Sequence, residues 1–317
     1  MTGYRVILNP VSGRGAAEQA APEIERQLAE RGLDFAVVRT ERPWHAAELA
    51  QQAVRDGVDV VVAAGGDGTS NEVLNGLMLA KTALGDHKTA MGVLSVGQGN
   101  DFAFGAGIPK DLPAACDVLA ANKRRRIDVG RVRGGLYPEG RYFGNGVGVG
   151  FDAVVGFEAF KLKRLHGFAA YAVAALRTMV IYYPAPVVRV SCGLEVLSQG
   201  SLMVSVMNGR RMGGGFMMTP QSAIDDGLLD LCVAGDIPRR KVLPLILRFM
   251  KGTQAGHPGI RFLRGREVTI EAVRGVLPAH ADGETLCVDG QRLDIEVLSQ
   301  QLDMLSLVES VVGEESR

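Results

Sequence analysis

The stretch that decides the fold is Val58–Glu72, which reads VDVVVAAGGDGTSNE. It begins as a nearly uninterrupted run of β-branched residues, which is typical of a strand buried on both faces. Three glycines around Asp67 then break the run, and a helical spacing of apolar residues follows from Val73. A strand, a glycine turn and a helix N-terminus together favour anion binding, because the backbone can approach a phosphate and present free N–H groups to it.

Asp67 is the informative residue of this stretch. A carboxylate in a phosphate-binding turn repels the phosphate unless a cation lies between them, and magnesium on a nucleotide is the cation that fits. The sequence therefore indicates a magnesium–nucleotide site. The alternative is that Asp67 only caps the helix that begins near Thr69.

Two further turns of the same kind flank this stretch. The strand-like run Tyr4–Leu8 leads into the turn Asn9–Gly15, and the run Met91–Val96 leads into Gly97–Phe102. Because the carboxyl ends of parallel strands lie at one edge of a sheet, we expect the three turns to share a ligand site there. Taken singly, the same residues are also ordinary turn and helix-cap residues, and each turn keeps that alternative.

Composition and net charge limit the class of protein and the partners that it can attract. The chain has 317 residues, of which 47% are hydrophobic and 22% charged, and this fits a soluble globular protein of two domains. Lys plus Arg and Asp plus Glu number 35 each, so no net charge attracts nucleic acid, and any attraction to an anionic membrane must be local. The four cysteines form no metal or redox motif and no signal-peptide pattern is present, which indicates reduced thiols in a cytoplasm.

Residues 1–126 alternate between strand and helix patterns. This alternation predicts an α/β domain with a parallel sheet and helices on both faces. The expected strands are Tyr4–Leu8, Phe35–Arg39, Val58–Ala63 and Met91–Val96, and the expected helices are Ala16–Arg31, Pro43–Arg55, Asn71–Lys81 and Leu112–Ala121.

Residues 127–297 are dominated by strand patterns, which predicts a β-rich second domain, a sandwich-like or rolled antiparallel sheet. The expected strands are Ile127–Val132, Tyr142–Val149, Val187–Val196, Leu202–Asn208, Leu229–Val233, Glu267–Glu271, Thr285–Val288 and Leu293–Val297. The expected helices are Phe151–Phe160, Gly167–Tyr182 and Arg239–Met250, followed by Leu302–Val312 in the last segment, 298–317. The most apolar stretch, Phe168–Val188, is interrupted by an arginine and two prolines, so we expect a buried helix there and no membrane span.

The three turns, in this order, resemble the diacylglycerol kinase catalytic family, which includes bacterial lipid kinases and sphingosine kinases. The resemblance covers nearly the whole chain, because it continues through Asn208, Gly213–Gly215, Pro220, Asp225–Asp230 and Asp282–Glu284. The Gly65–Thr69 turn alone is shared with NAD kinases, and the later blocks favour the lipid-kinase branch. The resemblance also implies that residues 298–317 pack back on the first domain.

For the first domain the resemblance implies a Mg-ATP site. The residues expected to bind the nucleotide are Asn9, Pro10, Ser12, Gly13, Thr40, Gly65, Gly66, Asp67, Gly68, Thr69, Asn71, Glu72, Gly97, Gln98 and Asn100. Asp67 and Asp101 are expected to share a magnesium–phosphate cluster that serves catalysis. The family often has Thr or Ser where this chain has Gln98, so one hydroxyl contact of the family has no counterpart here.

For the second half the resemblance makes Glu284 the general base that accepts the proton of the acceptor hydroxyl, with Asp282 ordering the site. It also implies a structural magnesium ion held by Asp226 and the backbone carbonyls of Ala223 and Leu228, an oxygen-only set that suits this ion. On the residues alone, an acidic turn and a β-turn with exposed acids remain the alternatives. The basic run Lys123–Arg126 fits either anionic lipid head groups or a solvated linker, and no role is assigned to the histidines.

The function implied is an ATP-dependent lipid kinase that transfers the γ-phosphate to a hydroxyl of a diacylglycerol-like or sphingoid lipid. ATP and Mg²⁺ are the expected cofactors. The expected partner is a lipid substrate at a membrane surface, reached by peripheral contact from the cytoplasm, without nucleic acid; a homodimer stays open. The alternatives are an NAD kinase and a nucleotide-binding regulator without catalysis, and the presence of both Asp67 and Glu284 argues against the regulator.

Overall fold

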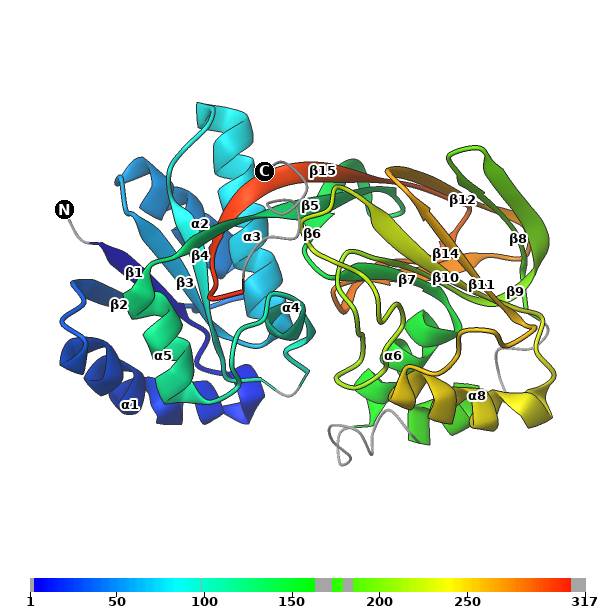
Figure 1. The fold of residues 1–317 in the computed structure, drawn as a ribbon, viewed down its shortest axis with the longest axis horizontal. Helices are drawn as coiled ribbons and strands as arrows, with labels where there is room; N and C mark the ends of the chain where they lie inside the picture. The colour runs from blue at the N-terminus through cyan, green and yellow to red at the C-terminus, as the bar shows by residue number, and fades with distance from the viewer. Residues whose placement is uncertain (1–2, 98, 163–172, 179–184, 309–317) are drawn as a thin grey trace. The chain divides into compact units, whose positions relative to one another are not determined.

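The computed structural model describes residues 3–97, 99–162, 173–178 and 185–308. The chain forms two compact units (Figure 1), of which the first comprises residues 1–129, 224–226 and 299–317 and the second comprises residues 130–223 and 227–298. The predicted domain limits are 126/127 and 297/298, whereas residues 127–129 and 224–226 lie in the first unit and residue 298 lies in the second. Within the described ranges, no helix combines the length and the apolar character that crossing a membrane requires.

The first unit is built on a parallel sheet in the order β2-β1-β3-β4. Its strands are β1 (Tyr4–Leu8), β2 (Phe35–Arg39), β3 (Val60–Gly65) and β4 (Ala90–Ser95). Every residue of β3 is buried, as the unbroken β-branched run predicts for a strand covered on both faces. The end of β15 (Arg292–Leu305) joins the sheet beside β4, where Met304 pairs with Met91 in parallel.

Helices cover both faces of this sheet (Figure 1). The connections from β1 to β2 and from β2 back to β3 run in opposite directions along the sheet, so right-handed crossovers place their helices on opposite faces. Accordingly, the helix after β1 packs with α5 and the helix after β2 packs with α3. The helices are α1 (Ala16–Glu30), α2 (His45–Arg55), α3 (Asp67–Leu84), the short α4 (Asp101–Gly105) and α5 (Leu112–Ala121), with a 3-10 turn at Ser12–Arg14.

The second unit is an antiparallel β-sandwich. One layer contains β8 (Val187–Cys192), β12 (Glu267–Arg274) and the first part of β15, and the other runs in the order β14-β13-β7-β9-β10-β11. The long strand β9 (Glu195–Met207) belongs to both layers, since its start pairs with β8 and its end with β7 and β10. The other strands of the second layer are β7 (Gly146–Gly150), β10 (Leu229–Gly235), β11 (Ile260–Gly265), β13 (Leu277–Ala281) and β14 (Glu284–Gly290). A further strand, β5 (Arg124–Gly134), begins in the first unit and pairs in the second with β6 (Tyr137–Phe143).

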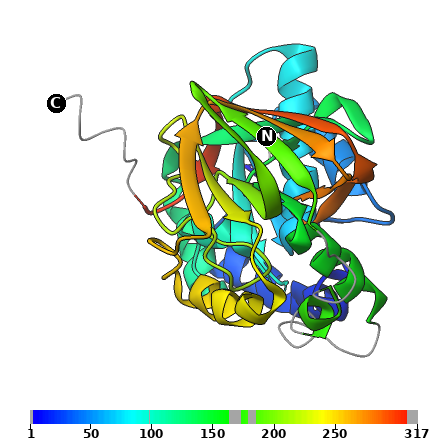
Figure 2. The same ribbon diagram turned by 90° about the vertical axis from the view of Figure 1, so that its right-hand side faces the viewer.

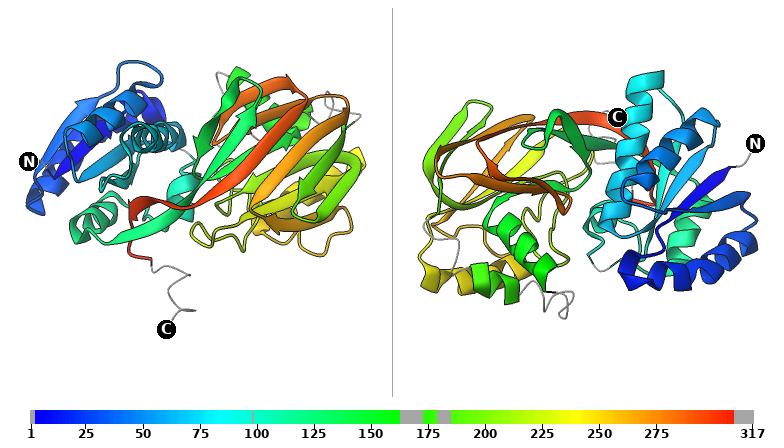
Figure 3. Two further views of the ribbon diagram at one scale, coloured as in Figure 1. Left: turned by 90° about the horizontal axis from the view of Figure 1, so that it is seen from above. Right: turned by 180° about the vertical axis from the view of Figure 1, so that it is seen from behind.

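Two cores hold the second unit together. Branched aliphatic side chains such as Val190, Val206 and Ile270 fill the space between the two layers. The outer face of the second layer is covered by α6 (Phe151–Lys161), the helical residues 173–178 and α8 (Arg239–Lys251), whose apolar side chains form the other core (Figures 1, 2 and 3). The predicted fold class, a parallel α/β part and an antiparallel β-rich part, is therefore confirmed.

Several predicted elements differ from the structure. Leu302–Leu305 belongs to a strand and not to a helix, because it pairs with the sheet of the first unit; residues 309–312 of that predicted helix lie outside the described residues. The predicted strand Tyr142–Val149 is divided between β6 and β7 by a turn at Gly144–Asn145. Of the predicted helix Gly167–Tyr182, residues 173–178 are helical and the others lie outside the described residues.

Candidate functional site

The three glycine turns meet at the carboxyl edge of the parallel sheet. The N–H of Gly66 donates to Ser12 Oγ over 3.0 Å, which joins the second turn to the first. Asn9 Nδ2 donates to Thr69 Oγ1 over 3.1 Å, a second link between these turns. Val96 directly precedes the third turn. Its N–H donates to the carbonyl of Gly65, at the start of the second turn, over 2.8 Å. The convergence expected from strand order is therefore present.

The turns approach one another closely at glycine positions. A Cβ atom on Gly97 would lie 2.5 Å from the Cα of Gly66, and one on Gly13 would lie 2.8 Å from the carbonyl oxygen of Val96. Gly13 also has φ of 57°, a left-handed conformation that favours glycine. Glycine is therefore needed at these positions for the turns to pack together, and phosphate binding by their backbone stays a prediction.

The carboxylates of Asp67 and Asp101 both approach the Cβ position of Gly99. A Cβ atom on Gly99 would lie 2.7 Å from Oδ2 of Asp67 and 3.7 Å from Oδ2 of Asp101. Asp67 is the first residue of α3, and its Oδ1 accepts the N–H of Phe102 in α4 over 3.1 Å. Oxygen atoms of two carboxylates at a phosphate-binding edge are the donors that magnesium prefers.

Asn100 shapes the third turn. Its φ is 53°, and its Nδ2 donates to the carbonyl of Gly97 over 3.0 Å. Gln98, between these two residues, lies outside the described residues. Thr40 lies at the same sheet edge, where its N–H donates to the carbonyl of Leu8 at the end of β1. Pro10 lies just beyond Leu8, the last residue of β1, at the same sheet edge.

Two residues predicted to contact nucleotide are engaged by the protein itself. The carboxylate of Glu72 accepts the N–H groups of Trp44 and Ala46 over 2.9 and 3.1 Å, and so caps the N-terminus of α2. Asn71 is 2% exposed and accepts from Asn75 one turn later in α3. Gly68 is the second residue of α3. For Asn71 and Glu72 the structure offers a helix-positioning role, and nucleotide contact stays a prediction.

In the second unit, Asp282–Glu284 forms the tight hairpin between β13 and β14. Ala281 pairs with Glu284, and both Asp282 and Gly283 have positive φ, 47° and 88°, which is the type I′ geometry that an Asp-Gly pair favours. The carboxylate of Asp282 accepts three backbone N–H groups, from Gly144, Asn145 and Gly146, over 2.8, 3.1 and 2.8 Å. Asp282 therefore holds the β6–β7 turn, and it presents Glu284 as an exposed side chain at the start of β14.

A buried polar pair that sequence reasoning missed lies beside this hairpin. His280 Nδ1 accepts the N–H of Gly283 over 3.2 Å, and its Nε2 lies 3.9 Å from Oδ2 of Asp152, an oxygen that has no hydrogen-bond partner among the described residues. The pair fits because a Cβ atom on Gly148, opposite His280 in the sheet, would overlap both side chains. The alternation Gly146-Val147-Gly148-Val149-Gly150 is the signal that could have indicated it, since it leaves one face of β7 without side chains.

Asp152 and His280 make opposing contributions to the pH dependence of folding stability. Burial raises the pKa of Asp152 from 3.8 to about 7, so between these values the folded state holds a proton that the unfolded chain has released, and this contribution to stability falls as pH rises. Burial lowers the pKa of His280 from 6.5 to about 4, so over that interval its contribution rises with pH.

We therefore expect His280→Gln to be less stable at pH 6.5 than at pH 4.5, and Asp152→Asn to show the reverse trend, because each variant keeps one of the two titrations. Urea unfolding midpoints at about pH 4.5, 5.5 and 6.5 measure both slopes. Wild type serves as the reference, and identical pH dependence in all three proteins would contradict this assignment.

The predicted structural magnesium ligands lie near a buried ion pair. Asp225 is fully buried, and its Oδ2 accepts a hydrogen bond from Arg125 Nε over 2.9 Å while its Oδ1 lies 2.8 Å from Nη2 of the same arginine, an ion pair that attaches residues 224–226 to the start of β5. The next residue, Asp226, is half-buried. The predicted magnesium ligands are Asp226 and the backbone carbonyls of Ala223 and Leu228. They include a single carboxylate, and this magnesium site stays a prediction.

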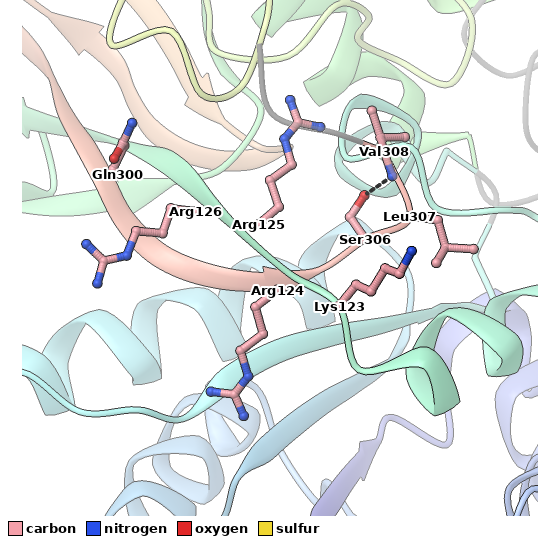
Figure 4. A pocket seen from close by; sticks show the side chains of 8 residues that line it. All are labelled: Lys123, Arg124, Arg125, Arg126, Gln300, Ser306, Leu307 and Val308. Atoms are coloured by element: carbon pink, nitrogen blue, oxygen red, sulfur yellow. Dashed lines mark hydrogen bonds between the residues drawn. The ribbon is translucent and has the colours of Figure 1, made fainter. Parts of the chain in front are cut away.

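The basic run Lys123–Arg126 lines a cavity of about 370 Å³ in the first unit, together with Gln300 and Ser306–Val308 (Figure 4). Figure 4 shows that the four basic side chains point in different directions. Arg125 is paired with Asp225, Arg124 donates to the carbonyl of Lys88, and Arg126 lies 3.4 Å from Asp303. These cations serve local contacts and do not converge on one anion.

Comparison with known proteins identifies the family. The model of the diacylglycerol kinase catalytic domain matches residues 3–132, and that of the YegS C-terminal NAD kinase beta sandwich-like domain matches residues 145–306. A diacylglycerol kinase of Mycobacterium tuberculosis is 31% identical over 282 residues, which cover 89% of this chain and 88% of that protein.

Solved structures share the fold. The crystal structure of a diacylglycerol kinase from Bacillus anthracis superposes with a TM-score of 0.70 at 21% identity and covers 96% of each chain. An NAD kinase from Archaeoglobus fulgidus in complex with ATP superposes with a TM-score of 0.50 at 14% identity, over 96% of this chain and 93% of that one. The near full-length match to a curated relative, together with the two family models, places this chain in the diacylglycerol kinase family, whose members are lipid kinases that use ATP.

Proposed function

We propose that this lipid kinase transfers the γ-phosphate of ATP to a hydroxyl of a diacylglycerol-like or sphingoid lipid at a membrane surface, which it contacts peripherally from the cytoplasm. The observation that carries the proposal is the convergence of the three glycine turns, with the carboxylates of Asp67 and Asp101 both close to Gly99. The relatives named diacylglycerol kinase support the acceptor class.

The first unit supplies the nucleotide site in this proposal. The backbone of Gly65–Gly66 and Gly97 lies next to the phosphates, while Asn9 and Ser12 hold the turns together. Asp67 and Asp101 fit a magnesium ion because they bring carboxylate oxygens to the phosphate-binding edge; when bound, the ion neutralises charge on the phosphates.

The second unit supplies the acceptor side. Glu284 is the general base that takes the proton from the lipid hydroxyl, and Asp282 orients it by holding the hairpin against the β6–β7 turn. Catalysis then depends on positioning and charge neutralisation more than on covalent chemistry, as is usual for phosphoryl transfer.

One assay tests the acceptor class. Purified protein is incubated with magnesium, γ-labelled ATP and a panel of micellar lipids, with NAD as a parallel acceptor. We expect label in the organic phase with at least one diacylglycerol-like or sphingoid lipid. Label on NAD would instead assign the activity of the NAD kinases that share this fold, and ATP binding without any transfer would indicate a regulator.

A further inference from the structure

Helix α8 (Arg239–Lys251, RRKVLPLILRFMK) carries two apolar stripes. The inner stripe, Val242, Leu245 and Phe249, is at most 5% exposed and belongs to the core that covers the second layer of the sandwich. The outer stripe is Leu243, Leu247 and Met250, which are 50%, 53% and 39% exposed. At 3.6 residues per turn these three side chains lie within about 60° of one another around the helix axis. Figures 1 and 2 show α8 on the outside of the second unit.

The outer stripe is bordered by cations. The helix contains five basic residues and no Asp or Glu, although the whole chain has equal numbers of basic and acidic residues. By the same helical geometry, Arg239 lies on one side of the stripe, and Arg240 and Lys251 lie on the other. All three are exposed. An apolar stripe flanked by cations is the pattern of helices that lie in the plane of a membrane interface.

We propose that the outer face of α8 docks on an anionic phospholipid bilayer. Leu243, Leu247 and Met250 enter the boundary between head groups and acyl chains, and the flanking arginines and lysine contact the lipid phosphates. A bilayer fits better than a protein groove because every charged residue of the helix is basic and cations lie at both of its ends, which matches a continuous anionic surface. This inference rests on the proposed function in one respect, that a membrane lipid is the acceptor.

Vesicle sedimentation without ATP tests the docking separately from catalysis. At low salt we expect the wild type to bind vesicles containing phosphatidylglycerol, and to bind phosphatidylcholine vesicles much more weakly. Leu243→Gln with Leu247→Gln should weaken binding to the anionic vesicles by about tenfold or more, because two leucines no longer leave water. Arg240→Gln with Lys251→Gln should also weaken it by about tenfold and reduce its dependence on salt.

Matched controls separate docking from folding. Leu194 and Val196, which are 104% and 60% exposed in the same unit, give the control variant Leu194→Gln with Val196→Gln, which should bind like wild type. Leu243→Met with Leu247→Met should retain binding, because the stripe stays apolar. Equal binding by the Leu243/Leu247 glutamine variant and wild type, or no wild-type binding at all, overturns the proposal.

Two further measurements distinguish this proposal from its alternatives. If the glutamine variant at Leu243 and Leu247 changes the oligomeric state in analytical ultracentrifugation, the stripe joins two copies and the proposal fails. Kinase activity is then compared on vesicles and on a monomeric short-chain acceptor. We expect this variant to lose activity on vesicles alone. A protein that binds vesicles but phosphorylates neither acceptor would keep the docking surface and reject the proposed function.

Discussion

Asp67→Asn should lower kcat by about 10³-fold or more, because it removes the charge that balances magnesium at the phosphate-binding edge. The fold should tolerate the change. Oδ1 of Asp67 accepts the N–H of Phe102, and the amide oxygen of asparagine can accept the same hydrogen bond. We therefore expect a melting temperature near that of wild type, with activity measured by transfer of labelled phosphate to a micellar lipid.

Asp59→Asn is the matched control for this prediction. Asp59 is exposed and directly precedes β3, at the opposite end of the strand from Asp67, so the same chemical change should leave activity intact. If Asp67→Asn retained more than about a tenth of the wild-type rate, Asp67 would have no catalytic role. A large fall in melting temperature would instead make Asp67 a structural residue that joins α3 to α4.

The meeting of the three glycine turns was predictable because its signals are local. Each turn follows a buried strand and precedes a helix. The order of the parallel strands then brings the turns together, independently of the side chains in the segments that connect them. The role of Glu72 was not predictable in this way. Its carboxylate caps α2, an element 26 to 28 residues earlier, and sequence spacing carries no sign of that packing.

The second unit depends on contacts that are distant in sequence. Asp282 accepts N–H groups from residues 136 to 138 positions away, and only the pairing of β13 with β7 brings them together. The same pairing places His280 opposite Gly148 and leaves room for Asp152. The sequence pattern predicts a helix at Leu302–Leu305 because short apolar runs have no clear period, and pairing with strands distant in sequence decides the conformation instead.

Glu284 is exposed, and the hairpin that carries it is held in place by several hydrogen bonds. The type I′ turn sets its backbone, Asp282 holds that turn through three hydrogen bonds, and His280 accepts the N–H of Gly283 beside it. None of these contacts uses the Glu284 side chain. A substitution that keeps its size should therefore change the chemistry of the site and leave the hairpin in place.

Glu284→Gln should accordingly lower kcat by about 10²–10⁴-fold, the usual scale for removing a general base, with the KM for ATP unchanged because the nucleotide edge belongs to the first unit. Glu267→Gln is the control: Glu267 is an exposed glutamate at the first residue of a strand in the same unit, and its loss should leave kcat within about twofold. Steady-state kinetics with a micellar lipid, together with direct measurement of ATP binding, checks both variants. A loss below about tenfold in Glu284→Gln would remove this residue from the mechanism, because another group would then have to accept the proton of the lipid hydroxyl.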